Sequence, residues 1–127
     1  AYEIHESLVG SEMCIRDRQK AANHEAKASV LTLLTYNYSR LLGREKRYEE
    51  CIEVAQYGYD ICVKYNKCQE MGGLLLNIAC ALHDLGRDKE SKSKLLDSYY
   101  AYRLMQRYSS CDVIKKYAMD TWGEVLF

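Results

Sequence analysis

The sequence contains no proline at all, one phenylalanine and no long apolar run. Proline breaks helix interiors and marks the turns of β-rich chains, so its absence favours an almost entirely helical protein. No apolar run approaches the roughly 20 residues that a membrane span needs, so we expect no membrane partner. The 18 basic residues balance 18 acidic ones, which argues against a strongly cationic surface and against direct nucleic-acid binding.

Paired cysteine spacings are also missing, although the chain has six cysteines. Cys51 and Cys62 are eleven residues apart, or three helical turns, and we expect them on one apolar helix face. We interpret the cysteines as reduced, buried thiols that pack as small hydrophobic side chains. With no secretory signal in the sequence, these thiols favour a cytoplasmic protein.

Residues 1–18, with the sequence AYEIHESLVGSEMCIRDR, show no helical period that continues past Arg18. This segment closely resembles a translated sequencing-adapter read, a string that recurs at the ends of unrelated sequences. We therefore predict that residues 1–18 are not native and that one repeat domain spans residues 19–127. On this interpretation, a domain that precedes Gln19 in the gene is missing from the chain.

The remaining sequence matches itself at an offset of 40 residues. The first members of the five matched pairs are Leu34, Asn37, Leu42, Glu50 and Tyr59, and the second members are Leu74, Asn77, Leu82, Glu90 and Tyr99. Helix–turn–helix units that repeat at about 34 to 45 residues are typical of α-solenoids, which bind other chains.

Hydrophobic periodicity predicts five helices. Their expected ranges are about 21–42, 48–65, 70–85, 88–108, and a fifth from Ser109 or Ser110 to Gly123. In the first helix we expect a buried stripe formed by Ala26, Val30, Leu34, Tyr38 and Leu41, with Gly43 as the C-cap. The predicted fold is all-α, with antiparallel helix pairs in a right-handed solenoid.

The segment from Asn77 to Gly86, followed by Arg87 to Ser91, resembles a tetratricopeptide repeat. That family places a small residue midway along its first helix, a glycine at the turn and a small residue one turn into its second helix. Ala79, Gly86 and Ser91 occupy those positions. The earlier unit departs from the pattern, with Ser39 and Cys51 as its small residues and a turn about two residues longer.

More narrowly, the stretch from Tyr36 to Glu50 resembles the C-terminal repeat region of Xre-type helix-turn-helix regulators of Gram-positive bacteria. The resemblance covers essentially all of residues 19–127. It implies that the repeats sense a signal, often a short peptide, that they mediate homodimerisation, and that a DNA-binding domain precedes them.

A concave groove lined by the first helix of each unit is the expected binding site. Asn37 and Asn77 occupy equivalent places there, and an amide can pair with a peptide backbone; the alternative is that each bridges neighbouring helices. Arg40 and Arg44 lie one turn apart and could hold a peptide carboxylate, or they could form a solvated helix face. The full predicted set is Tyr36, Asn37, Arg40, Arg44, Asn77, Cys80, His83 and Asp84.

Catalytic and cofactor motifs are missing from this sequence. Cys80 and His83 have an i, i+3 spacing that could ligate a metal, but a structural zinc site needs four ligands and no second pair is visible. We therefore expect no metal, no cofactor and no enzyme activity. The favoured function is a ligand-sensing and dimerising domain of a transcription regulator that binds a peptide or protein segment. A stand-alone tetratricopeptide adaptor is the alternative.

Overall fold

A computed structural model describes the backbone of residues 11–126 and the side chains of residues 23–126. Within this part the chain is entirely helical, with five helices and no strand. The helices are α2 (Ser11–Arg44), α3 (Tyr48–Lys64), α4 (Met71–Asp84), α5 (Asp88–Leu104) and α6 (Tyr108–Trp122).

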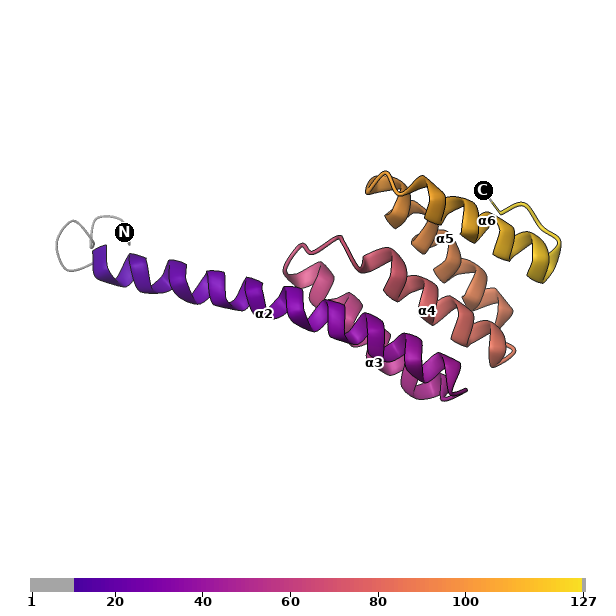
Figure 1. Ribbon diagram of the computed structural model, residues 1–127, viewed down its shortest axis with the longest axis horizontal. Helices are drawn as coiled ribbons and strands as arrows, with labels where there is room; N and C mark the ends of the chain where they lie inside the picture. Colours follow the sequence, from indigo (N-terminus) through magenta and orange to yellow (C-terminus); the bar gives the residue numbers. More distant parts are fainter. Residues whose placement is uncertain (1–10, 127) are drawn as a thin grey trace.

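The helices pack in sequence order, each against the next (Figure 1). Helix α4 lies between α3 and α5 and also contacts α2. Helix α2 has 34 residues, twice the length of its neighbour α3, and its first half extends beyond the other helices (Figure 1). The packed part of the molecule is therefore the second half of α2 together with α3 to α6.

Helices α2, α3, α4 and α5 end in one kind of turn, although the connection from α3 to α4 has six residues and the other connections have three. Each turn contains one residue with positive φ, and these residues are 20 apart in the sequence: Lys46, Asn66, Gly86 and Gln106. In the first turn the Arg47 amide donates to the Leu42 carbonyl at 2.9 Å, and in the third the Arg87 amide donates to the Leu82 carbonyl at 2.9 Å. A hydrogen bond that spans six residues across a left-handed residue is the Schellman ending of a helix.

Two expectations about the first turn are wrong. Gly43 is not the C-cap, because it lies inside α2 and the left-handed residue is Lys46. The turn is also no longer than its counterpart, since three residues separate α2 from α3 and three separate α4 from α5. Lys46 rather than Gly43 occupies the place of Gly86, and a lysine gives no signal for that backbone conformation.

The helix ends differ from prediction in three further places. Helix α2 begins at Ser11 rather than at about residue 21, through a stretch without proline or glycine in which good helix formers predominate. Residues 11–18 are thus helical, while residues 1–10 lie outside the described part. Helix α5 ends at Leu104 instead of continuing to Tyr108, and the residue before α6 is Arg107, with no serine cap.

The core forms where α4 meets its neighbours. Leu74, Ile78 and Leu82 of α4 pack against Ala55 and Cys62 of α3, and each of these five residues is buried. As expected, Cys51 and Cys62 are both buried on one side of α3, but burial does not hold for every cysteine, since Cys68 is exposed. The apolar period of α4 therefore predicted its buried face, and that of α3 did so only in part, because Val63, which the same period places on the buried face, is 57% exposed.

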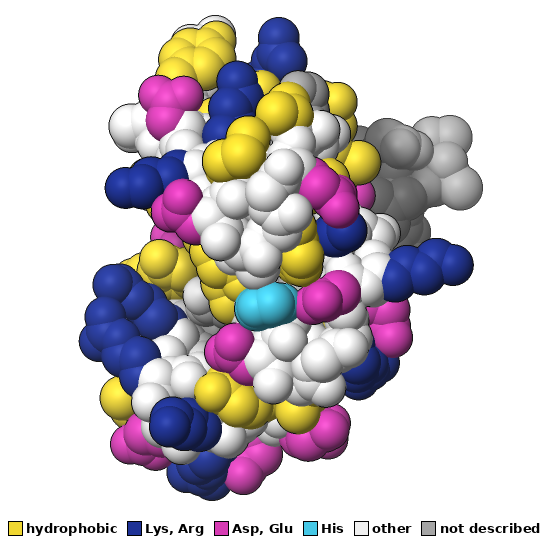
Figure 2. All heavy atoms as spheres, turned by 90° about the vertical axis from the view of Figure 1, so that its right-hand side faces the viewer, with side chains coloured by type: hydrophobic (Ala, Val, Ile, Leu, Met, Phe, Trp, Pro, Cys, Tyr) yellow, Lys and Arg dark blue, Asp and Glu magenta, His cyan; other side chains and the backbone are white. Residues whose placement is uncertain are grey.

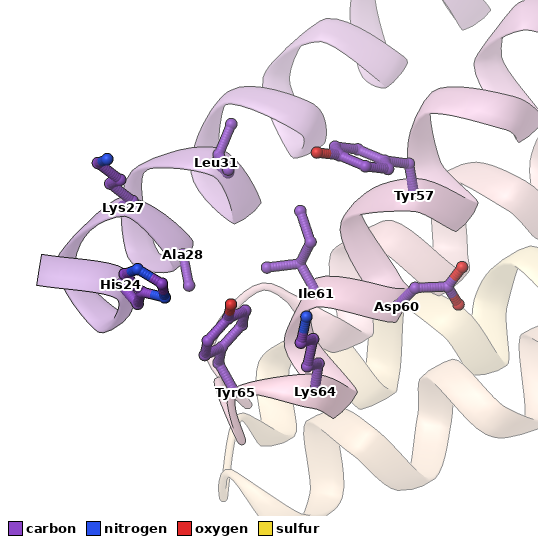
Figure 3. A pocket seen from close by; sticks show the side chains of 9 residues that line it. All are labelled: His24, Lys27, Ala28, Leu31, Tyr57, Asp60, Ile61, Lys64 and Tyr65. Atoms are coloured by element: carbon purple, nitrogen blue, oxygen red, sulfur yellow. The ribbon is translucent and has the colours of Figure 1, made fainter. Parts of the chain in front are cut away.

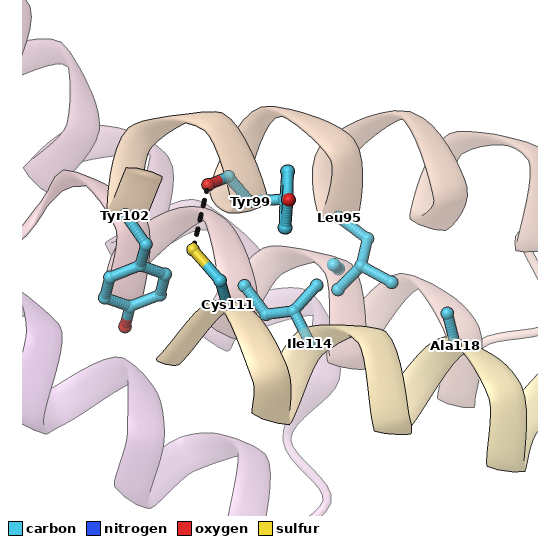
Figure 4. Packing of buried hydrophobic residues seen from close by; sticks show 7 residues of the cluster. Leu95, Tyr99, Tyr102, Cys111, Ile114 and Ala118 are labelled. Atoms are coloured by element: carbon cyan, nitrogen blue, oxygen red, sulfur yellow. Dashed lines mark hydrogen bonds between the residues drawn. The ribbon is translucent and has the colours of Figure 1, made fainter. Parts of the chain in front are cut away.

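A second cluster joins α5 to α6 (Figure 4). Leu95, Tyr99 and Tyr102 of α5 face Cys111 and Ile114 of α6, and all are buried. The Cys111 thiol donates to the Tyr99 carbonyl across the helix pair, with 3.7 Å between sulfur and oxygen. Helix α6 thus closes this end of the packed helices with Cys111, Ile114 and Ala118.

The buried side of α2 was predicted wrongly. The five residues of the expected stripe are exposed, namely Ala26, Val30, Leu34, Tyr38 and Leu41. The buried side consists instead of small side chains and Leu42, and its hydroxyl groups bond to the backbone of their own helix. Thr32 donates to the Ser29 carbonyl and Thr35 to the Thr32 carbonyl, both at 3.0 Å. Hydroxyls satisfied in this way can be buried without a partner on another helix.

Close helix approach explains why this side is made of small residues. A Cβ atom placed on Gly58 of α3 would lie 2.1 Å from the Thr35 hydroxyl oxygen of α2. One placed on Gly73 of α4 would lie 2.4 Å from the Tyr36 ring. Glycines at these positions let α2 lie against α3 and α4 with no room between them for larger side chains.

Candidate functional site

The predicted site residues meet at a hollow of about 200 Å³ where α2, α3 and α4 come together. Five of the eight predicted residues line it: Arg40, Arg44, Asn77, Cys80 and Asp84. The sequence prediction therefore located this junction. It did not include the other lining residues, which are Ser39, Gly43, Tyr48, Cys51 and Ala81.

Two arginines form the cationic wall of the hollow. Arg40 and Arg44 are both exposed and lie one helical turn apart on α2. Within residues 23–126 neither guanidinium is part of an ion pair or a side-chain hydrogen bond. Two unpaired guanidinium groups at this spacing offer several N–H donors to one carboxylate.

Asp84 of α4 and Tyr48 of α3 also line the hollow. Burial raises the pKa of the Tyr48 phenol, and the neighbouring Asp84 carboxylate raises it further. Tyr48 therefore stays protonated at neutral pH and can act as a hydrogen-bond donor. The lining of the hollow thus contains an acidic group and a phenol in addition to the two arginines.

The floor of the hollow contains Asn77, whose amide joins α4 to α2. Its Nδ2 donates to the Tyr36 carbonyl at 3.2 Å and to the Ser39 hydroxyl at 2.9 Å. Bridging of neighbouring helices, the alternative interpretation of this residue, is therefore what Asn77 does. Its amide hydrogens are engaged in fixing the position of α2 and are not free for a ligand.

The two thiols in the hollow both have raised pKa values. Burial raises the pKa of Cys51 to about 11, and the nearby Cys80 contributes in the same direction. Burial likewise raises the pKa of Cys80, and its contact with Tyr117 partly offsets this. Because the thiolate is the nucleophile and the metal ligand, neither cysteine is poised for covalent chemistry at neutral pH.

The other three predicted residues lie outside the hollow. The Tyr36 ring is half-buried against Gly73 and packs on the α3–α4 core. Asn37 is exposed on α2 and does not share the environment of Asn77. His83 lies one turn along α4, where its Nδ1 is 2.6 Å from the Asp88 carboxylate and its ring meets Trp122 edge to face. The repeat thus placed Asn37 and Asn77 in register, but their surroundings differ.

The Cys80–His83 spacing does not assemble a metal site in the described residues. No group of three histidine, cysteine, aspartate or glutamate side chains there is arranged to hold a metal ion. His83 pairs with Asp88, and this contact lowers the pKa of the Asp88 carboxyl. The pair joins the end of α4 to the start of α5.

Two of the lining residues that sequence reasoning missed, Tyr48 and Cys51, lie on the second helix of the unit, α3. Cys51 is the small residue one turn into α3, and its thiol points at the Asn77 carbonyl with 3.8 Å between sulfur and oxygen. Ser91, its equivalent on α5, donates to the Ala79 carbonyl at 2.6 Å. The small residue of each second helix therefore faces a first helix, a signal that could have placed Cys51 at the junction.

A larger hollow, of about 590 Å³, lies between α2 and α3, and no sequence prediction concerned it (Figure 3). Ala28, Leu31 and Ile61 supply its apolar surface, while Lys27 and Lys64 lie at its edge.

Figure 2 shows the end of the molecule that carries residues 45–47 and 85–87, where acidic and basic side chains are interspersed. That mixture agrees with the balanced charge of the sequence.

No helix in the described part of the chain is long and apolar enough to cross a membrane. In comparisons with known proteins, no family model, no curated protein and no solved structure matches the chain.

Proposed function

We propose that this chain is a helical-repeat domain that binds an acidic group of a peptide or protein segment at the hollow between α2 and α4. The observation that carries the proposal is the pair of unpaired guanidinium groups of Arg40 and Arg44 beside that hollow. At about 200 Å³ the hollow is large enough for one side chain or a terminal carboxylate of a ligand.

The repeat supports a binding domain over an enzyme. The 40-residue offset recurs in the backbone as the repeated turns at Lys46 and Gly86. Arg47 donates from Nε to Glu50 at 3.0 Å, and Arg87 donates from Nε to Glu90 at 3.0 Å, so both second helices begin alike. Repeated helix pairs of this kind, arranged as a right-handed tetratricopeptide-like solenoid, use their first helices as a binding surface.

Within that class we infer a ligand-sensing domain of a transcription regulator. The resemblance of residues 36–50 to Xre-type regulators supports this assignment. In such a protein a bound segment would change the relative angles of α2 and α4, and an attached DNA-binding domain would respond to the change. The Asn77 bridge to Tyr36 and Ser39 is the contact through which α4 and α2 would move together.

Selection of binders from a display library of eight-residue peptides with free C-termini tests the ligand site. We expect enrichment of peptides with an acidic residue or the C-terminal carboxylate as the anchor. Replacement of both arginines, R40A/R44A, should weaken the selected peptides at least about tenfold, since each charge-assisted bond contributes on the order of 1.5–3 kcal/mol.

Arg103→Ala provides the matched control, because Arg103 is exposed on α5 and does not line the hollow. It should leave peptide affinity unchanged. Peptides that bind R40A/R44A as tightly as the unchanged chain would refute the site. Sequencing the genomic locus upstream of Gln19 tests the regulator assignment separately, since an encoded helix-turn-helix domain is expected there.

A further inference from the structure

One side of α2 carries a continuous exposed apolar stripe. It consists of Val30, Leu31, Leu34, Tyr38 and Leu41, whose exposed fractions are 57%, 38%, 57%, 49% and 49%. Single exposed apolar residues are common on protein surfaces, but a row along one side of a helix marks a contact surface. The stripe spans three turns of the best-packed part of α2.

The internal repeat shows how the equivalent row of apolar residues on α4 is covered by another helix. At the 40-residue offset, Leu34 and Tyr38 correspond to Leu74 and Ile78 of α4. Those residues of α4 are 0% and 1% exposed, because α3 packs over them. On α2 no helix of the described part takes that place. The stripe therefore has the position and the chemistry of a helix-packing face.

The opposite end of the stacked helices is different. The outward side of α6 is mixed: it presents the exposed charged residues Asp112, Lys115, Lys116 and Asp120 together with Val113 and Met119, which are 61% and 46% exposed. The four charged side chains of this face would have to lose water on contact with an apolar stripe, at a cost in free energy. Contact between the α6 end of one molecule and the α2 end of the next would therefore bury charged groups, which contact between two apolar stripes avoids. Two copies of the α2 stripe suit each other better.

The intervals between the residues of this row are the same whether α2 is followed from its N-terminal or its C-terminal end. Along α2 the spacing is four, three, four, three and four residues through Lys27, Leu31, Leu34, Tyr38, Leu41 and Glu45. Alternation of three and four is the spacing with which two helices interlock their side chains. A cation at one end and an anion at the other make the row complementary to its own antiparallel copy.

We propose that the chain forms a two-fold symmetric homodimer in which α2 packs antiparallel against α2 of a second copy. A two-fold axis near residue 36 brings together three kinds of pairs: Lys27 with the partner's Glu45, Leu31 with the partner's Leu41, and Leu34 with the partner's Tyr38. A parallel pairing would instead place Lys27 beside the partner's Lys27. The end charges thus select the antiparallel arrangement.

Both charged residues are available for this contact. Lys27 has no ion pair within residues 23–126. Glu45 makes a long contact of 3.8 Å with Arg47, and both side chains there are about half exposed. Leu31 also lines the hollow between α2 and α3, opposite Tyr57 (Figure 3). The partner's Leu41 would therefore meet an apolar surface wider than α2 alone.

The size of the stripe sets the expected strength of the dimer. The stretch of helix between Lys27 and Glu45 spans about 27 Å. One helix pair of this length lies at the small end of specific interfaces, for which dissociation constants in the micromolar range are expected. The dimer surface is separate from the Arg40–Arg44 hollow. It would be the surface through which the dimerisation implied by the regulator assignment takes place. Failure of peptide binding and failure of dimerisation are thus distinguishable.

Sedimentation velocity of the full chain from about 1 to 200 micromolar tests the proposal, since that range brackets a micromolar dissociation constant. We expect a monomer–dimer equilibrium, and Leu34→Glu should weaken it at least about tenfold. Leu104→Glu is the matched control, because Leu104 is 85% exposed on α5 and lies outside the stripe. Circular dichroism of each variant checks that the fold is retained.

A charge exchange tests the antiparallel arrangement. Lys27→Glu and Glu45→Lys should each weaken the dimer about two- to fivefold, and the double variant should recover most of that loss. A chain that stays monomeric over the whole range would overturn the proposal. So would a dimer that survives Leu34→Glu, or a double variant that is weaker than both single ones.

Discussion

Gly58 is the position at which a single methyl group should do the most damage for its size. The Cβ of an alanine there would lie 2.1 Å from the Thr35 hydroxyl oxygen, 2.8 Å from its Cβ and 3.0 Å from Leu74 Cδ2. Thr35 has little freedom to move away, because its hydroxyl donates to the Thr32 carbonyl at 3.0 Å. Helices α2 and α3 would have to separate.

The expected net effect of Gly58→Ala combines two opposing terms. Overpacking of this kind costs about 1–3 kcal/mol, whereas replacing glycine by alanine inside a helix contributes up to about 1 kcal/mol of stability. We therefore expect a net loss of about 1–2 kcal/mol in the free energy of unfolding. Urea denaturation followed by circular dichroism measures it directly.

Gly43→Ala is the control with the opposite sign. Gly43 is also inside a helix, but an added Cβ would meet its nearest neighbour, the Cys51 sulfur, at an ordinary 3.7 Å. This variant should gain about 0.5–1 kcal/mol. If Gly58→Ala also stabilised the chain, the close approach of α2 and α3 would be wrong.

Two further predictions concern a turn and an ion pair. Lys46 has φ of 62°, a left-handed conformation that glycine adopts without strain, so Lys46→Gly should raise the free energy of unfolding by about 1 kcal/mol. If urea denaturation showed no gain in stability, the left-handed turn would be contradicted. The hydrogen bond from His83 lowers the pKa of the Asp88 carboxyl from its usual value of 3.8. The hydrogen bond therefore stabilises the fold above pH 3.8, and this stabilisation is lost as the pH falls through the lower pKa that Asp88 has in the folded protein. Below about pH 4 the melting temperature should therefore fall more steeply for the unchanged chain than for Asp88→Asn, and equal slopes would contradict the pairing.

The spacing of apolar residues predicted the buried side correctly for a helix that is packed between two other helices. On α4 the apolar residues Leu74, Ile78 and Leu82, which recur at helical spacing, are all buried, since α3 and α5 flank this helix. On α2 the same reasoning selected the wrong side. Its buried side depends on Thr32 and Thr35, whose internal hydrogen bonds make polar residues suitable for burial. The hydrophobicity of the residues alone does not indicate that these threonines can be buried.

The candidate site was predictable in part for a related reason. Repeat register correctly brought Asn77 and the two arginines to one junction, because register depends on spacing alone. What each side chain does there depends on its neighbours from other helices, such as Ser39, which accepts one of the Asn77 hydrogens. The turn at Lys46 was missed because the conformation is imposed by the helices on either side, and glycine marks it only at Gly86.

The 20-residue interval between the left-handed turn residues has a consequence for how this chain can change in length. A copy of residues 47–86 inserted after Gly86 would join Gly86 to an arginine, as in the existing Gly86–Arg87 junction. Every turn would keep its backbone, and the protein would grow by one helix pair. A single residue inserted within a helix would instead rotate all following side chains by about 100° and uncover the core. Duplication in 40-residue steps is thus the change in length that this architecture can accept, in evolution or in the laboratory.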